Sequence, residues 1–309
     1  MLKIKKIYVD SRWQTADSKS HTDFYYDLGN TYDMPENTSF YIDDINIPNS
    51  WYSIEENVNN NMYLAWREPI TNSEIFSIIS LPSNIYDGDE FIKALNIVLD
   101  SQTAATVGGA TVKRFTAAFN SVKNVFTISS TNCTYFKIMS DDELKVSTKA
   151  WAGPSATFQN DNLRSLNEVI KQYGDTIAYS LNKAYVSGYL DFSHYNNIYM
   201  TSNIGNYQTL SPSKGLTTIR KIPVNVPSGS VMNDRQISQY DLLDCSRQCL
   251  SMLNFRFHDA YGGTINLNGC HVSFSIVFSN RKEDMYNFHG IPCFPRKIKK
   301  TLVIYYIEL

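Results

Sequence analysis

Apolar side chains take every second position in two stretches of the chain, residues 253–257 and residues 272–278. Successive side chains of a strand point to opposite faces, so each stretch has one apolar face and one mostly polar face. Gly262-Gly263 and Asn268-Gly269 lie between them and can supply the positive φ that tight turns need. The pattern predicts two antiparallel strands with a bent linker, in a sheet that is buried on one side.

Similar short apolar runs bounded by turn residues occur on both sides of a central region with a different pattern. They predict strands at residues 23–28, 39–47, 184–186, 198–202, 216–226 and 301–309. Many short strands with turn signals are typical of a β-sandwich or a jelly roll. We therefore expect a mainly β chain organised as a single jelly-roll β-sandwich with an inserted small α+β domain.

The central region mixes hairpins with helical periodicity. Hairpins are predicted at 62–66 with 75–81 and at 112–119 with 125–129, and a short strand at 135–138. Asp87 and Glu90 have the spacing of a helix start, and short helices are also predicted from 140–143 and within 163–170, whereas 103–109 is predicted as a loop. The helix that follows Asp87 places apolar residues at helical spacing: Phe91, Ile92, Leu95, Val98 and Leu99.

These patterns divide the chain into four parts. The jelly-roll domain is expected from residues 21–55 and 184–280, with the inserted α+β domain at 56–183 and a C-terminal tail at 281–309. Residues 1–20 are basic and then polar, so we expect an N-terminal arm that orders only against a neighbour. The tail contains Pro292, Pro295 and a basic run at 296–300.

Composition narrows the function classes. The chain has 309 residues and a formal net charge of -2, which gives no strong field for nucleic acid. Its five cysteines form no Cys-x-x-Cys pair and indicate free thiols in a reducing compartment. The first residues resemble no signal peptide, and the apolar run at 302–307 is too short to span a bilayer.

Few residues suggest catalysis or metal binding. The chain lacks the nucleophile elbow, the phosphate-binding glycine loop, the dinucleotide fingerprint and the His-Glu-x-x-His motif. Cys245 and Cys249 lie four residues apart, as in half of a zinc site, but two small buried thiols are the favoured interpretation because no second pair completes four ligands. His258 and Asp259 have the chemistry of an acid/base pair, and a surface pair beside a turn is favoured.

Charged clusters have simple structural interpretations. Asp43-Asp44 and residues 141–143 supply carboxylates, which are common calcium ligands. These residues lack the alternating acidic spacing of a calcium-binding loop. Strand-end and helix-start roles are favoured for them. The basic clusters at 3–6 and 296–300 are consistent either with nucleic-acid contact or with a solvated charge run.

A series of motifs resembles the penton proteins of virophages, Polinton-like viruses and adintoviruses. The order and number of these motifs carry the resemblance, which spans residues 7 to about 279. They are residues 7–12 (IYVDSR), 23–28 (DFYYDL), 41–52 (YIDDINIPNSWY), 81–91 (LPSNIYDGDEF), 221–224 (KIPV) and 267–275 (LNGCHVSFS). The tail after Asn280 is longer than the family leads one to expect.

The resemblance implies a minor capsid protein with a single jelly roll, five copies of which close each vertex of an icosahedral double-stranded DNA virus. It implies no catalytic residue, no metal and no cofactor. The implied partners are the chain itself as a homopentamer, the major capsid protein, and the genome or minor proteins through the N-terminal arm. A host surface, contacted through the inserted domain, is a further implied partner.

The implied location is the virion, after synthesis in the host cytoplasm or a virus factory. Two other hypotheses stay open beside this one. A receptor- or glycan-binding module, such as a fibre head, is the second, because jelly rolls also form lectins. A hydrolase with an unrecognised site is the third, and the fold alone does not choose among them.

Overall fold

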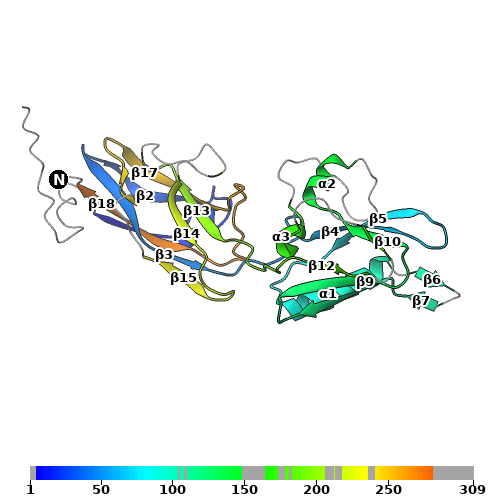
Figure 1. Ribbon diagram of the computed structural model, residues 1–309. Helices are drawn as coiled ribbons and strands as arrows, with labels where there is room; N and C mark the ends of the chain where they lie inside the picture. Colours follow the sequence, from blue (N-terminus) through cyan, green and yellow to red (C-terminus); the bar gives the residue numbers. More distant parts are fainter. Residues whose placement is uncertain are drawn as a thin grey trace, which may run out of the picture.

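The computed structural model describes residues 5–103, 105–107, 110–147, 164–172, 178–180, 183–205, 212, 218–235 and 241–280. These residues form two lobes joined by extended segments (Figure 1). The predicted strand at 301–309, the tail at 281–309 and the basic run at 296–300 lie outside the described residues. Among the described helices, none is both long enough and apolar enough to cross a membrane.

The first lobe is a sandwich of two antiparallel sheets. The first sheet has the order β1 (Lys6–Asp10), β18 (Ser273–Asn280), β3 (Thr38–Pro48) and β15 (Val231–Asp234), and β16 (Leu243–Asp244) pairs with the other half of β3. The second sheet has the order β14 (Thr218–Pro223), β13 (Asn197–Ser202), β17 (Cys249–His258) and β2 (Asp23–Asp33).

In this lobe the first strands along the chain pair with the last ones, and strands nearer the middle of the chain pair with each other. β1 pairs with β18, β2 with β17, β3 with β15 and β16, and β13 with β14. A long hairpin whose paired strands roll up into two facing sheets is the arrangement of a jelly roll, so the predicted fold class is confirmed. The whole inserted region lies in a single connection, between β3 and β13.

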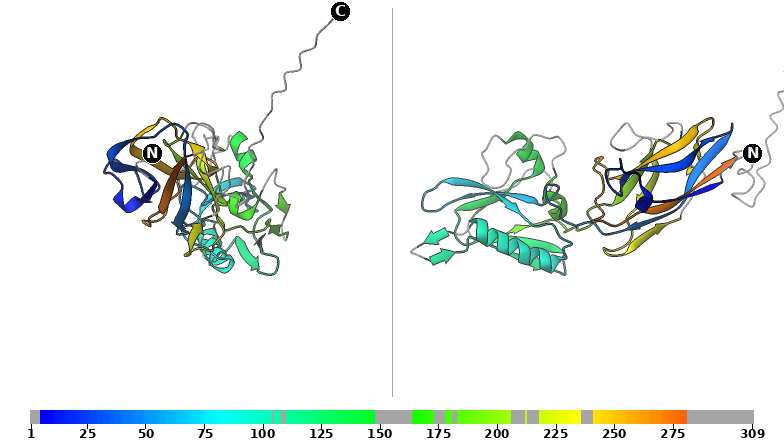
Figure 2. Two further views of the ribbon diagram at one scale, coloured as in Figure 1. Left: turned by 90° about the vertical axis from the view of Figure 1, so that its left-hand side faces the viewer. Right: turned by 180° about the vertical axis from the view of Figure 1, so that it is seen from behind.

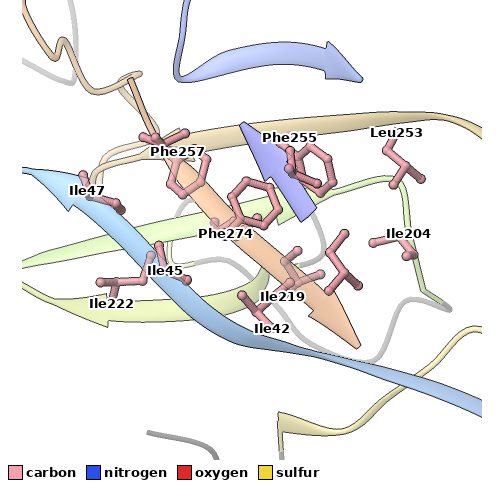
Figure 3. Close-up of a cluster of buried hydrophobic side chains, with 14 of the residues drawn as sticks. Ile42, Ile45, Ile47, Ile204, Ile219, Ile222, Leu253, Phe255, Phe257 and Phe274 are labelled. Atoms are coloured by element: carbon pink, nitrogen blue, oxygen red, sulfur yellow. The ribbon is translucent and has the colours of Figure 1, made fainter. Parts of the chain in front are cut away.

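The two stretches with strict alternation form β17 and β18, but they lie in facing sheets and not in one sheet. Phe274 of β18 meets Phe255 and Phe257 of β17 across the sandwich, with ring centroids 4.8 and 6.0 Å apart (Figure 3). The prediction of a shared sheet is therefore wrong, while the predicted burial of these side chains is confirmed. Alternation identifies a buried face, but two strands can supply that face from opposite sides of a core.

Part of the predicted N-terminal arm belongs to the sandwich. Residues 6–10 form β1, and Ile7 and Val9 point into the core opposite Ile276 and Phe274. The following segment is also attached, because Ser11 N–H donates to Val272 at 2.9 Å and the Thr22 hydroxyl donates to Ile265 at 2.6 Å. The prediction of a separate arm over all of residues 1–20 is therefore wrong. Apolar residues alternate along Lys6–Asp10 as in a short edge strand, but this pattern lies among lysines and was read as part of a basic segment.

The inserted lobe has its own sheets and helices. One sheet has the order β11 (Tyr179–Ser180), β10 (Tyr135–Ile138), β4 (Asn61–Arg67) and β5 (Glu74–Ser80), and another has the order β12 (Tyr185–Val186), β9 (Val125–Ser130) and β8 (Phe115–Asn120). The helices are α1 (Gly88–Thr103), α2 (Asp141–Val146) and α3 (Asn167–Ile170). Seen from behind, α1 lies along the lower part of this lobe (Figure 2), where it packs on β8 and β5.

The predicted start and apolar face of α1 are confirmed. The Asp87 carboxylate accepts a hydrogen bond from the Glu90 N–H at 2.8 Å, which satisfies one of the free donors of the first turn. Four of the five apolar residues that define the face are buried, and Val98 packs against the same core from a partly exposed position. The buried four are Phe91, Ile92, Leu95 and Leu99.

Three details of the inserted lobe differ from the sequence predictions. Residues 105–107 and 110–112 pair as a short hairpin, β6 and β7, where a loop was expected. Residues 185–186 pair with β9 of the inserted lobe and not with the jelly roll. Trp51 packs in the core of the jelly roll, whereas Ile54 packs in the core of the inserted lobe. The chain therefore passes from the first lobe to the second between these two residues. Two-residue strands carry no periodicity, so only the partner shows where they belong.

Candidate functional site

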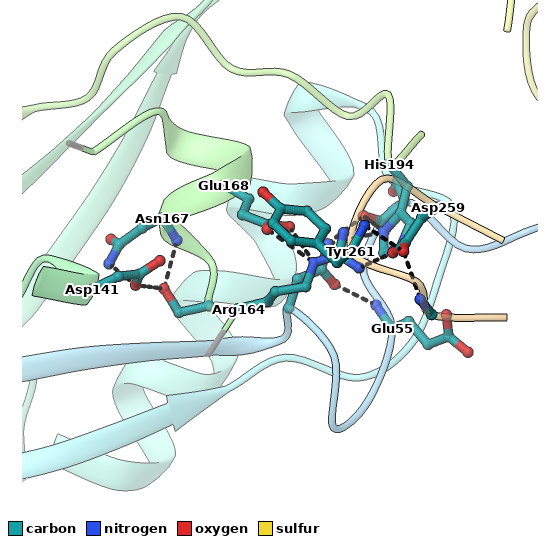
Figure 4. A network of polar contacts seen from close by, with 12 residues as sticks. Glu55, Asp141, Arg164, Asn167, Glu168, His194, Asp259 and Tyr261 are labelled. Carbon is teal, nitrogen blue, oxygen red and sulfur yellow. Dashed lines mark hydrogen bonds and ion pairs between the residues drawn. The ribbon is translucent and has the colours of Figure 1, made fainter. Parts of the chain in front are cut away.

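A cluster of polar side chains lies where the two lobes meet (Figure 4). Arg164, just before α3, donates through Nε to Glu168 at 2.9 Å and through Nη1 to Asp259 at 2.7 Å. Asp259 follows β17 of the jelly roll, so one guanidinium joins both lobes. Its carbon also lies 4.9 Å from the centre of the Tyr261 ring, at the distance of a cation–π contact. We call Arg164, Glu168, Asp259 and Tyr261 the junction clamp.

The turn after β17 is built around the Asp259 carboxylate. Oδ1 accepts from the N–H of Tyr261 at 2.9 Å and from that of Gly263 at 2.7 Å. Gly262 has a φ of +88°, and a Cβ on Gly263 would lie 3.2 Å from the carboxylate. The predicted need for glycine at this turn is therefore confirmed, and the reason at Gly263 is close approach to Asp259.

His258 and Asp259 were expected on the surface, and this prediction is wrong. Their exposed fractions are 1% and 4%. His258 stacks on Tyr199 with centroids 5.9 Å apart, and its Nδ1 donates to the Asp259 carbonyl at 2.7 Å. Burial lowers the pKa of His258 and so favours the neutral ring. Strand alternation does assign His258 to the outer face of its sheet, but tertiary contacts cover that face here.

His194 lies beside the junction clamp on the segment that returns from the inserted lobe. Its Nδ1 is 3.0 Å from the Asn59 amide nitrogen, and its ring meets Tyr195 edge-on at 4.1 Å. Burial and the nearby charge of Arg164 lower its pKa to about 4. The imidazole is therefore neutral near pH 7, and its Nε2 has no hydrogen-bond partner among the described residues.

The support of the clamp comes from α2 and α3. The Asp141 carboxylate accepts from the Asn167 amide at 2.7 Å and from the Ser165 hydroxyl, which ties the two helix starts together (Figure 4). Ser140 and Glu143 form a reciprocal capping box on α2. The helix-start role predicted for residues 141–143 is thus confirmed. Both helices hold Arg164 at the edge of the jelly roll.

An open cleft of about 510 Å³ lies beside the clamp and is lined by both lobes. Its walls carry charges of both signs, including Lys145, Lys171 and Asp191. The carboxylates of Glu168 and Asp259 both face one guanidinium, so neither is placed as a free base. Within the described ranges, no group of three or more His, Cys, Asp or Glu side chains is arranged to hold a metal ion. The contacts observed in this cluster fasten one lobe to the other.

The other candidate residues are dispersed. Cys245 is buried, and burial raises the pKa of its thiol to about 12. Cys249 is exposed at the start of β17, so the interpretation as two buried thiols holds only for Cys245. The four described cysteines are all free, and Cys293 lies outside the described residues.

The acidic pair in β3 and the basic residues near the N-terminus contact each other. Asp43 lies within β3 and pairs with Lys6 at 2.5 Å, while Asp44 accepts from the Ser275 hydroxyl. The expected strand-end role is wrong, because both aspartates lie at a register shift in the middle of the strand. Lys6 is thereby part of the sheet, and Lys3 lies outside the described residues.

Sequence reasoning missed Arg164 and His194. The only local signal for Arg164 is Glu168 four residues later, the spacing of an ion pair on one helix face. Nothing in the sequence pairs Arg164 with Asp259, which is 95 residues away. His194 is isolated in a polar loop, so its burial follows only from the meeting of the lobes.

Comparisons with known proteins give structural neighbours only. No family model and no curated protein matches the sequence. The fold is similar to that of the mavirus penton protein, with 10% identity and a TM-score of 0.47 over 89% of this chain and 99% of the other. It is also similar to a chain of the Sputnik virophage structure, with 13% identity and a TM-score of 0.43 over 91% of this chain and 99% of the other.

Proposed function

We propose that this chain is a structural capsid protein that forms the pentameric vertex of an icosahedral double-stranded DNA virus. The observation that carries the proposal is the complete jelly-roll strand order with its only long insertion, within the described residues, between β3 and β13. Jelly rolls build viral capsids and lectins. The ordered motifs that resemble virophage-type pentons favour the capsid role over the lectin role.

The surface of the jelly roll supports lateral packing. A closed ring needs two different contact surfaces on each subunit, because one surface of each copy meets the other surface of the next. The two edge strands of the first sheet each expose an apolar side chain: Tyr8 on β1 is 73% exposed and Val231 on β15 is 58% exposed. These opposite edges are the surfaces that we assign to neighbouring copies.

The remaining partners follow from this arrangement. The major capsid protein would surround the ring, and the residues before β1 would face the genome or minor proteins. The inserted lobe leaves the end of the jelly roll where β3 stops at Pro48, so it would project away from the ring and be available to a host surface. The protein would reside in the virion, after synthesis in the host cytoplasm or a virus factory.

An image of the virus particle tests the proposal. We expect density for the jelly roll at the five-fold vertices, and we expect Tyr8→Asp to lower vertex occupancy by placing a charge in the contact between copies. Ile70→Asp is the matched control, because Ile70 is also largely exposed but lies in the β4–β5 turn. Density at six-fold positions, or absence from the particle together with glycan binding, would contradict the proposal and favour the lectin-like alternative.

A further inference from the structure

A second pocket, of about 410 Å³, lies between the lobes and is lined by both apolar and polar side chains. Both lobes and both connecting segments contribute to it. The aromatic and aliphatic residues that line it are Trp51, Ile85, Tyr86, Tyr189, Leu190, Phe192, Tyr195, Val224, Val226 and Pro227. We call it the aromatic pocket.

Two features mark the aromatic pocket as a docking surface. Tyr189 and Ile85 are 65% and 40% exposed, whereas Trp51, which also lines the pocket, is buried. Large apolar side chains that gather at a concave site are typical of binding surfaces. Of the described residues that line it, only Asp191 is charged, and that carboxylate already pairs with Lys171 at 2.8 Å. The lining itself therefore contributes no cation, and the nearby Lys171 ammonium is neutralised by Asp191.

This chemistry matches one type of peptide. Segments with proline at every third position present an extended, low-entropy backbone that packs between aromatic rings, and cations beside the prolines gain from nearby aromatic faces. The chain itself contains such a segment outside the described residues: Pro292-Cys-Phe-Pro295 is followed at once by Arg296-Lys297. We propose that the aromatic pocket of one copy binds residues 291–297 of a second copy.

The path of the chain favours a second copy. Asn280, the last described residue, pairs with Thr38 at one end of β3, while Asn49 at the other end lines the aromatic pocket. The 11 residues of β3 span about 35 Å at the usual rise per residue. The 12 residues from Asn280 to Pro292 reach about 40 Å only when fully extended. To fill the pocket of its own chain, the tail would have to run fully extended back along its own sheet. The tail of a neighbouring copy does not have to follow that path.

A peptide titration tests the occupant. The probe is a fluorescein-labelled peptide of residues 289–300 with serine for Cys293, and the protein is the full chain with Pro292→Ala and Pro295→Ala, whose own tail cannot compete. We expect saturable binding by fluorescence anisotropy. Tyr189→Ser should weaken it at least tenfold, and Tyr25→Ser, which changes another exposed tyrosine outside the pocket, should leave it unchanged. A scrambled peptide of the same charge that binds equally well would overturn the proposal.

A mixing experiment tests whether the contact joins two copies. The double proline variant keeps its pocket and lacks a competent tail, while Tyr189→Ser keeps its tail and lacks a competent pocket. We expect sedimentation velocity to detect mixed pairs in an equimolar mixture at a concentration where each variant alone sediments as a smaller species. A mixture that sediments as its separate components would overturn binding between copies. The outcome is independent of the capsid proposal, which depends on location in the particle.

Discussion

Replacing Phe274 with alanine tests whether the two lobes have separate cores. The side chain is 2% exposed and packs edge-on against Phe255 and Phe257 of the facing sheet. Such a truncation costs about 3–5 kcal/mol, because it loses the buried ring and leaves a cavity. Two edge-to-face contacts are lost as well, so we expect the upper half of that range. A typical domain has about 5–15 kcal/mol of stability in total, so the jelly roll would become marginal.

The matched variant in the other lobe is Leu95→Ala. Leu95 is fully buried on α1, in a core that shares no residue with the core around Phe274. Its truncation should cost about 2–5 kcal/mol in the inserted lobe. Since the two sites have no common contacts, the effects of the two changes should add in the double variant.

Hydrogen exchange followed by mass spectrometry separates the two effects. Amides of β17 and β18 should lose protection in Phe274→Ala, while amides of α1 and β8 keep theirs, and Leu95→Ala should give the reverse pattern. The size of each effect follows from the shift of the urea midpoint, at about 1–3 kcal/mol per molar urea. Equal loss of protection in both lobes from either change would refute the separation of the cores.

Three further predictions concern the junction and the N-terminus. Arg164→Met should loosen the lobes and raise the radius of gyration by small-angle scattering, because it breaks the pair with Asp259, whereas Lys113→Met, which breaks an exposed pair, should not. His194 has its pKa lowered from 6.5 to about 4, so its contribution to stability is present above about pH 6.5 and is lost as the pH falls towards 4. His194→Gln should therefore flatten the fall of the melting temperature across that window, and an unchanged slope would contradict the assignment. Deleting residues 1–20 should destabilise the jelly roll itself, because it removes β1, and a melting temperature equal to that of the full chain would be inconsistent with the pairing of β1 to β18.

The sequence determined the class of fold and most of the local elements. Strict alternation at 253–257 and 272–278 indicates buried strand faces, and the spacing after Asp87 indicates the apolar face of α1. Both patterns predict the structure correctly because they depend only on neighbours along the chain. The glycines at 262–263 were identifiable for the same reason, since the backbone of a tight turn is a local requirement.

The tertiary structure decided which segments meet. β17 and β18 look alike in sequence, yet they belong to facing sheets, and β1 joins the fold through a partner almost 270 residues later along the chain. Arg164 and Asp259 form one contact although no periodicity links them. A pairing of this kind depends on the free energy of the whole packed arrangement, to which residues far apart contribute together, so no local window of sequence contains it.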